Sequence, residues 1–123
     1  MSRGSVIPQI QGVLALDRTI HEPARYAILA ILMSVEYAEF TYLRAQTGLT
    51  QGNLSAHLTK LEAAGLVKVD KSFEGKRPKT TLSITPDGIE RVIAHSKELA
   101  RFLDLIGVKA SAIQKYQNRK ARR

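Results

Sequence analysis

Apolar residues recur at helical spacing near the start of the chain and predict two helices there. The first covers residues 11–20, while residues 1–10 are expected to be flexible. In the second, Pro23 suits the first turn, because its missing N–H would have no partner within the helix. The apolar residues that continue the helical spacing after it are Ile28, Leu29, Leu32 and Met33.

Two further helices are expected next, joined by a tight turn. Thr41 is the predicted N-cap of a short helix that Gly48 ends, and Thr50 is the predicted N-cap of a helix that ends at Gly65. This second helix carries a stripe of leucines that spans about 60° of its circumference and therefore predicts a buried face. The leucines of the stripe are Leu54, Leu58 and Leu61.

After Gly65 the apolar residues recur at every second position, which is typical of strands. Val67 and Val69 alternate with polar residues, and residues 80–85 alternate in the same way. The segment between them, "KSFEGKRPK", is expected to form a loop, because its glycine and proline are turn formers. The sequence therefore predicts a hairpin with a long basic tip.

The last predicted helix starts at residues 85–87, where a threonine cap, a proline and an acid follow one another, and runs to about Gly107. Along this helix, mostly apolar residues recur at alternating spacings of three and four, which is the pattern of a heptad seam. The apolar face is wider than this seam and wider than one small domain can cover, so we expect a homodimer, helped by the helix at 11–20. The predicted interface residues are Leu14, Ile89, Val92, Ile93, Ser96, Leu99, Leu103 and Ile106.

The predicted order places a helix-turn-helix before a hairpin and a long helix. The segment "GLTQGNLSAHLTKLEAAGLVKVDKSFEGKRPKTTLSITPDG" resembles the winged helix-turn-helix of bacterial and archaeal transcriptional regulators in the MarR and ArsR-like group. The likeness covers residues 20–105 and rests on the serine and His-Leu pair in the helix, "GLV" after it, the basic wing and "TPDG". It implies a mainly α fold with a small β-hairpin, a winged helix-turn-helix extended by a long C-terminal dimerisation helix. It also implies two-fold dimers on near-palindromic DNA.

The side of the 50–65 helix opposite the leucines is small in its middle and polar at its edges. Such a face fits the DNA major groove, about 12 Å wide, because bulky side chains would hold the backbone away. Gln51 and Asn53 can bind adenine edges, Ser55 and Thr59 a phosphate or a base, and Lys60 a phosphate. The predicted DNA-binding residues here are Thr50, Gln51, Gly52, Asn53, Ser55, Ala56, His57, Thr59 and Lys60.

Two interpretations of His57 stay open, because it lies at the border of the leucine stripe. In the families that the chain resembles, this position often lies at the DNA surface, but a half-buried histidine bound to a neighbour fits equally well. In the wing, Arg77 is the candidate for insertion into the minor groove, and Lys76 and Lys79 are candidates for phosphate contacts. The alternative for the wing is a charged loop that only aids solubility.

The charge of the chain adds a weaker argument for a nucleic-acid partner. The 123 residues carry a net charge of +8, which favours a polyanionic partner. Six of these eight charges lie after Asp104, where no acid follows. The basic tail, residues 108–123, is therefore either a solvated end or a binding arm.

The remaining composition limits the other classes of function. There is no Cys, which excludes disulfides, thiolate metal sites and cysteine nucleophiles, and fits a reducing cytoplasm. No apolar run reaches the roughly 18 residues that a membrane helix needs, and the N-terminal segment lacks the features of a signal peptide. We expect a prokaryotic cytoplasmic protein, nucleoid-associated when bound to DNA, whose winged-helix domain with its dimerisation helix covers residues 11–107.

We find no catalytic constellation, because the three histidines are scattered and no nucleotide-binding loop occurs. No enzyme, cofactor or bound metal is therefore predicted, and the sequence identifies no effector. RNA is disfavoured, since a helix does not enter the narrow major groove of A-form RNA. Two alternatives stay open: a winged helix that binds only proteins, and a metal-responsive sensor that uses His95 and Glu98.

Overall fold

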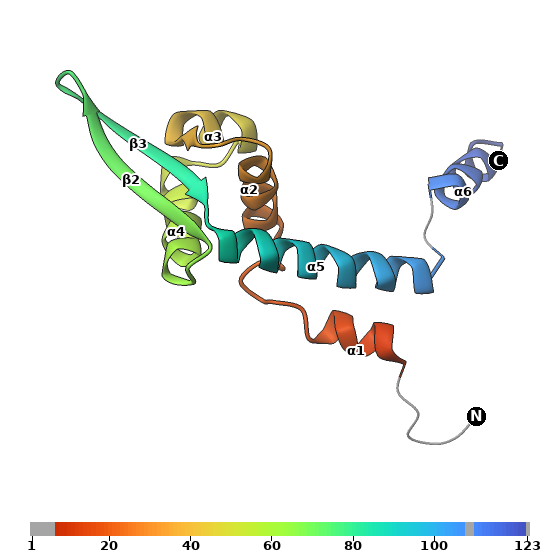
Figure 1. Cartoon of the computed structure of the whole chain (residues 1–123). Coiled ribbons are helices and arrows are strands. Elements are labelled where there is room, and N and C mark those ends of the chain that lie inside the picture. The colour runs from red at the N-terminus through yellow and green to blue at the C-terminus, as the bar shows by residue number, and fades with distance from the viewer. Residues whose placement is uncertain (1–6, 108–109, 123) are drawn as a thin grey trace. The chain divides into compact units, whose positions relative to one another are not determined.

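The computed structural model describes residues 7–107 and 110–122, and the chain divides into two compact units (Figure 1). Residues 17–94 form the first unit. The second combines the N-terminal segment up to Leu16 with the C-terminal segment from His95. Residues 1–6, part of the predicted flexible start, and two predicted tail charges, Lys109 and Arg123, lie outside the described residues.

Three helices and a small antiparallel sheet build most of the first unit. The helices are α2 (Pro23–Met33), α3 (Phe40–Thr47) and α4 (Gln51–Ala63). The sheet has the order β1-β3-β2, with β1 (Ala38–Glu39), β2 (Val67–Glu74) and β3 (Arg77–Ile84). Figure 1 shows the β2–β3 hairpin extending past the helices to a narrow tip. This arrangement confirms the predicted winged helix fold.

The core of the first unit consists of aliphatic side chains from its helices and from the sheet. The predicted leucine stripe of α4 is confirmed, since its three leucines are buried. Burial of each such side chain stabilises the fold by about 1.5–3 kcal/mol relative to exposure. The largest fully buried side chains are Ile20, Ile28, Leu29, Leu32, Leu43, Leu54, Leu61, Leu66 and Leu82.

Helix α4 is fixed at both ends by hydrogen bonds. At its start, Thr50 Oγ1 accepts the backbone amide of Asn53 at 3.1 Å, as the sequence predicts. At its end, Gly65 adopts a φ of 76°, and its amide donates to the carbonyl of Glu62, while the Leu66 amide donates to the carbonyl of Leu61. This Schellman arrangement leads the chain from the helix straight into β2.

The predicted long loop of the hairpin is wrong, because most of it is paired strand. Glu74 lies opposite Arg77, so only Gly75 and Lys76 form the turn. Gly75 has a φ of 65°, which suits the first position of a two-residue type II′ turn. Pro78 is tolerated because β1 pairs only with Thr81 and Leu82, which leaves the edge of β3 open beside the proline.

The bounds of two predicted helices also differ from the structure. The first helix, α1 (Pro8–Leu14), starts within residues 1–10, which were predicted to be flexible. It also ends before residue 20, because Asp17 Oδ1 accepts the Thr19 amide at 3.0 Å and turns the chain. Ile20 therefore enters the core from a turn. Thr41 is not an N-cap, since α3 starts two residues earlier than predicted, at Phe40, with Glu39 at the cap position.

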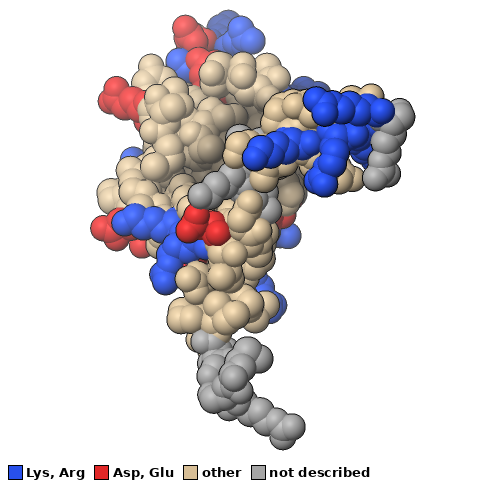
Figure 2. All heavy atoms as spheres, turned by 90° about the vertical axis from the view of Figure 1, so that its right-hand side faces the viewer, with Lys and Arg blue, Asp and Glu red and all other residues tan. Residues whose placement is uncertain are grey.

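The second unit contains α1, the later part of α5 (Pro86–Leu105) and α6 (Ala110–Ala121). Helix α5 starts as predicted, with Thr85 Oγ1 accepting the Gly88 amide at 2.9 Å. Much of the predicted tail is helical, because α6 lies within it. Figure 2 looks onto the side of Figure 1 where α6 lies, and at its upper right Lys and Arg side chains gather without an acid among them. Within the described ranges, no helix is long and apolar enough to cross a membrane.

Candidate nucleic-acid interface

Helix α4 turns a face without large apolar side chains toward solvent. The residues predicted to bind DNA on this helix are all exposed apart from His57. Near its start, a Cβ added at Gly52 would meet no atom within 4 Å, so the space in front of the backbone is open. A duplex can therefore approach the start of α4 closely, as a major-groove helix requires.

Hydrogen bonds within α4 decide which of its hydroxyl groups can donate to a phosphate. The Thr59 hydroxyl donates to the carbonyl of Ser55 at 2.9 Å, so its proton is already used. Thr50 Oγ1 accepts a backbone amide, which leaves its proton for another acceptor. Because phosphate oxygens only accept, Thr50 is better placed than Thr59 for a phosphate contact.

His57 lies half-buried between α4 and the start of α2, with 21% of its side chain exposed. Its Nδ1 is 3.3 Å from Nη1 of Arg25 and 3.7 Å from a carboxylate oxygen of Glu22. Since a guanidinium only donates, Nδ1 can take part in a hydrogen bond with Arg25 only as the acceptor. The structure thus gives His57 a neighbour, as the interpretation of a half-buried, hydrogen-bonded histidine requires. The other interpretation, a DNA contact by His57, stays a prediction.

Arg25 and Glu22 form a charged junction that sequence reasoning missed. Arg25 also donates from Nε to the carbonyl of Thr19 at 2.5 Å, while Glu22 accepts the Arg25 amide at 2.8 Å as the cap of α2. Partial burial raises the pKa of Glu22. The hydrogen bonds from the amides of Arg25 and Ala24 lower this pKa by more than burial raises it, so the pKa lies below its ordinary value. The junction holds α4 against α2 through His57.

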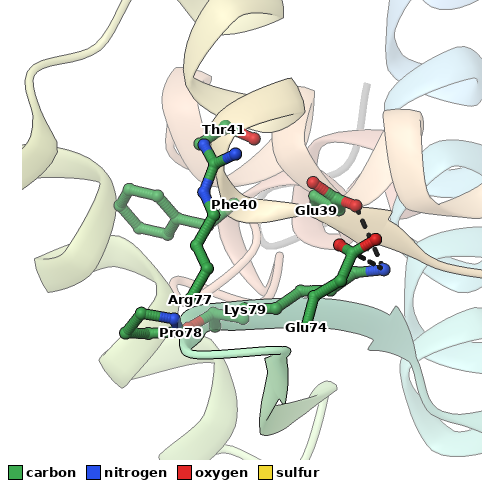
Figure 3. A pocket seen from close by; sticks show the side chains of 8 residues that line it. Glu39, Phe40, Thr41, Glu74, Arg77, Pro78 and Lys79 are labelled. Carbon is green, nitrogen blue, oxygen red and sulfur yellow. Dashed lines mark ion pairs between the residues drawn. The ribbon is translucent and has the colours of Figure 1, made fainter.

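Lys79 of the wing is engaged by two acids. It lines a hollow of about 200 Å³ beside β3. Its Nζ lies 3.3 Å from Glu39 and 3.9 Å from Glu74, and Figure 3 marks both ion pairs with dashed lines. The hydrogen bond to Glu39 raises the pKa of Lys79. A phosphate contact by Lys79 would therefore require it to exchange these partners.

Arg77, the predicted minor-groove residue, does not occupy the tip of the wing in this structure. Figure 3 shows its side chain crossing the hollow toward Thr41, in the first turn of α3. Lys76 instead stands in the turn itself. Arg77 is exposed, so its long side chain is free to reorient toward a bound duplex.

A groove of about 300 Å³ separates the outer face of α4 from the hairpin. From α4, three of the predicted DNA-binding residues line it: Gln51, Ser55 and Thr59. From the hairpin, Lys71 and Thr80 line it, and Glu62 lies at the C-terminal part of α4. Lys71 is a functional candidate that the predicted site did not include. Because Glu62 repels phosphates, the groove favours DNA contact along the N-terminal half of α4.

The second unit carries an exposed apolar surface that includes three of the eight residues predicted for the interface, namely Leu14, Leu103 and Ile106. Leu14 is 78% exposed and Ile106 is 52% exposed, although both are large and apolar. The exposed large apolar side chains on α1, on the end of α5 and directly next to these helices are Ile7, Ile10, Leu14, Leu103, Leu105 and Ile106.

Val92 is a correction to the predicted interface. It is 5% exposed and belongs to the core of the first unit, because α5 packs there near its start. Ile89 and Ile93 are exposed on the same helix, whereas Ser96 and Leu99 are half-buried.

His95 and Glu98, the pair considered for a metal site, have different environments. His95 is buried, whereas Glu98 forms an ion pair with Arg101 at 3.1 Å. In the part of the chain that the structure describes, no three His, Asp or Glu side chains gather as a metal ion would need.

Comparison with known proteins gives consistent matches. Residues 24–103 match the family described as winged helix DNA-binding domain. An uncharacterised protein from Methanocaldococcus jannaschii is 48% identical over 64 residues, which are 52% of this chain and 70% of that protein. A transcriptional regulator homologue from Pyrococcus horikoshii OT3 has a TM-score of 0.76 and 27% identity, over 83% of this chain and all of that chain.

More distant regulators share the fold. The transcriptional repressor CouR, solved bound to a 23-mer DNA duplex, has a TM-score of 0.63 and 20% identity, over 94% of this chain and 87% of its own. Its low identity shows the fold alone. A protein from Bacillus cereus described as a putative MarR-like transcription regulator, 12% identical with a TM-score of 0.63, shares the fold in the same way. The predicted resemblance to winged helix proteins is confirmed by the family match over residues 24–103.

Proposed function

Because the chain belongs to the winged helix DNA-binding domain family, we propose that it binds specific double-stranded DNA sequences as a homodimer. The Pyrococcus horikoshii protein that shares its fold is described as a transcriptional regulator homologue, and CouR as a transcriptional repressor bound to a DNA duplex. One observation carries the proposal: the outer face of α4 is free of bulk, fixed at both ends and placed beside a basic hairpin.

In this proposal, the N-terminal half of α4 enters the major groove. Gln51 and Asn53 read adenine edges, because their amide groups supply the donor and the acceptor that adenine pairs with. Thr50, Ser55 and Lys60 contact phosphates or nearby bases and fix the register of the helix. The small residues between them allow the helix backbone to lie close to the base edges.

The wing binds the flanking duplex. Lys71 and Lys76 contact phosphates, while Arg77 leaves its place beside α3 and reaches the minor groove. Lys79 helps only after it exchanges Glu39 and Glu74 for a phosphate. The wing therefore contributes mainly position and affinity, and α4 contributes sequence discrimination.

The exposed apolar residues of the second unit form the homodimer contact. A two-fold dimer places its recognition helices in successive major grooves, about 34 Å apart, which fits a near-palindromic site. Regulation then follows from any change in the spacing of the two DNA-binding units. Such a regulator acts on the nucleoid in a prokaryotic cytoplasm.

The DNA part of the proposal is tested by fluorescence anisotropy with the full-length chain and a random-sequence duplex. Between about 50 and 200 mM salt we expect a steep loss of affinity, with dissociation constants around 10⁻⁴ to 10⁻⁶ M at physiological salt. Ser55→Glu places a negative charge on the α4 face and is expected to weaken binding about tenfold. Ala30→Glu adds the same charge at an exposed site on α2 and is the control. If the affinity for the duplex changes neither with salt nor in either variant, the DNA proposal fails and a protein-binding module is favoured.

The homodimer part is tested by light scattering across a range of protein concentrations. Leu14→Glu and Ile106→Glu replace exposed apolar side chains, so we expect both variants to fold and to scatter as monomers. Ala94→Glu changes an exposed residue outside the apolar set on α5 and should leave the dimer intact. A wild-type chain that stays monomeric at high concentration would contradict the proposal.

A further inference from the structure

Phe73 is a large aromatic residue that lies 73% exposed on the wing. It stands on β2, just before the turn, and its partner across the hairpin is Pro78. An exposed aromatic ring at a hairpin end gains nothing for the stability of the fold, because its apolar surface stays in water. Its position therefore points to a contact outside the chain.

The register of the hairpin shows which way Phe73 faces. Alternate residue pairs share one face of a sheet, so the pair Val69 and Leu82 is followed outward on the same face by Lys71 with Thr80, and then by Phe73 with Pro78. Leu82 is buried in the core, while Lys71 and Thr80 line the groove beside α4. By this alternation Phe73 follows Lys71 on the same face, about 7 Å further out. At the end of the hairpin it also borders the hollow on the other side, which Ser72, Glu74 and Lys79 line.

The surroundings of Phe73 are basic on this part of the wing. Three basic residues, Lys71, Lys76 and Arg77, lie within four residues of it. Two acids, Asp70 and Glu74, lie in the same range but on the opposite face, and Glu74 is near Lys79 at 3.9 Å. A partner for this tip must offer negative charge outside and an apolar surface within reach. Duplex DNA offers both, because phosphates flank its stacked bases.

We propose that Phe73, backed by Pro78, is an apolar wedge that inserts between neighbouring base pairs from the minor groove and kinks the DNA. This inference rests on the proposed DNA binding of α4. The fixed φ of proline and the two-residue turn limit the motion of the hairpin end, so the ring is presented with little loss of entropy. Apolar wedges of this kind unstack a base step and bend the duplex.

The wedge gives the protein a means to select sequences that it does not contact by hydrogen bonds. Pyrimidine–purine steps such as TA and CA unstack at low cost, so the protein discriminates in favour of sites that carry them under the wing. Arg77 stands on the opposite face of the hairpin and contributes charge, which makes the two residues separable by mutation.

The test starts with a duplex that the full-length chain enriches from a random pool. Energy transfer between dyes at its two ends reports the bend, and 2-aminopurine placed at each flanking adenine reports unstacking. With the wild type we expect both signals. Phe73→Ser should lose both and bind about tenfold more weakly, whereas Phe73→Leu, still apolar, should keep most of the bend. Ser72→Ala, next to Phe73 on the other face, is the matched control.

The outcomes separate this inference from the proposed function. If the chain enriches no duplex, the DNA function fails and the wedge fails with it. If the wild type binds its enriched duplex without bending or unstacking, or if Phe73→Ser keeps both signals, the wedge is overturned and the DNA function stands. Phe73-dependent binding to phosphatidylserine vesicles, without a Phe73-dependent bend in DNA, would also overturn it.

Discussion

At the scale of single residues, Gly88 shows why a glycine stands at the start of α5. A Cβ at this position would collide with the backbone oxygen of Leu66 and approach Cγ1 of Ile84 within 2.9 Å. The backbone cannot give way without moving the end of the Schellman turn. We expect Gly88→Ala to lower the free energy of unfolding by about 1–3 kcal/mol, measured by urea denaturation.

Gly52→Ala is the matched control for this prediction. A Cβ at Gly52 meets no atom within 4 Å, and alanine favours a helix by up to about 1 kcal/mol over glycine. Its free energy of unfolding should stay equal or rise slightly. Equal losses in the two variants would show that close packing at Gly88 is not the reason for the glycine.

Arg91 joins three segments of the first unit at one point. Its Nε donates to Asp17 at 2.9 Å, and its Nη1 donates to the carbonyl of Ala64 at the end of α4, at 3.1 Å. Partial burial raises the pKa of Asp17. The hydrogen bonds from Arg91 and from the Thr19 amide together lower this pKa by more than burial raises it, so it lies below its ordinary value. The end of the recognition helix is thus tied to α5 by a charged group.

This contact predicts a stability that depends on pH. Because the pKa of Asp17 is lower in the folded chain than its ordinary value of 3.8, its contribution is complete above that value and disappears as pH falls through the folded pKa. We expect Asp17→Asn to cost about 1–2 kcal/mol at pH 7, and the difference from wild type to shrink in strong acid. Urea unfolding at several pH values measures it, and a difference that stays constant would contradict the assignment.

At the scale of elements, the caps of α3 and α4 form a matched pair. Thr50 caps α4 through its hydroxyl, whereas Thr41 lies in the first turn of α3 and caps nothing. We therefore expect Thr50→Ala to lower the free energy of unfolding by about 1 kcal/mol and Thr41→Ala to leave it nearly unchanged. Thermal and urea unfolding check both, and a larger loss at Thr41 would favour the cap that the sequence suggested.

The same elements show how far local sequence patterns reach. The buried face, the cap and the terminal glycine of α4 could be predicted, because each depends on residues within one or two turns. The paired part of the hairpin could not, since "KSFEGKRPK" contains turn formers and its strands are fixed by the register of partners across the hairpin. Thr41 failed as a cap because β1 leads the chain into α3 two residues earlier, at Phe40.

The candidate site divides in the same way. The exposed face of α4 followed from its helical angles, because a helix has one outward side once its leucines are buried. The contacts of His57 with Arg25 and of Lys79 with Glu39 join residues more than thirty positions apart, and no spacing in the sequence indicates them. These contacts decide which basic groups are free for DNA, so the tertiary fold had to be known first.

At the scale of the whole molecule, the basic residues behind the net charge of +8 lie in two regions with different expected roles. One is the winged-helix part with α4 and the wing, and the other is the α6 region. The α6 region carries Lys115, Arg119, Lys120 and Arg122 without an acid, far along the sequence from the recognition helix. Phosphate contacts raise affinity for every duplex, whereas contacts with base edges separate one sequence from another. The proposal therefore assigns discrimination to α4 and leaves to α6 only affinity that does not depend on sequence.

Two full-length variants test this division by anisotropy with an enriched duplex and a scrambled one. Changing the four basic residues of the α6 region to Gln is expected to make the salt dependence shallower, by about 0.9 in slope per lost phosphate contact, and to keep the ratio of the two affinities within about twofold. Asn53→Ala should lower that ratio about tenfold, because it removes an adenine contact and leaves the phosphate contacts in place. If the ratio of the two affinities falls in the α6 variant and stays unchanged in Asn53→Ala, the site of sequence recognition lies in the C-terminal region and the role assigned to α4 is wrong.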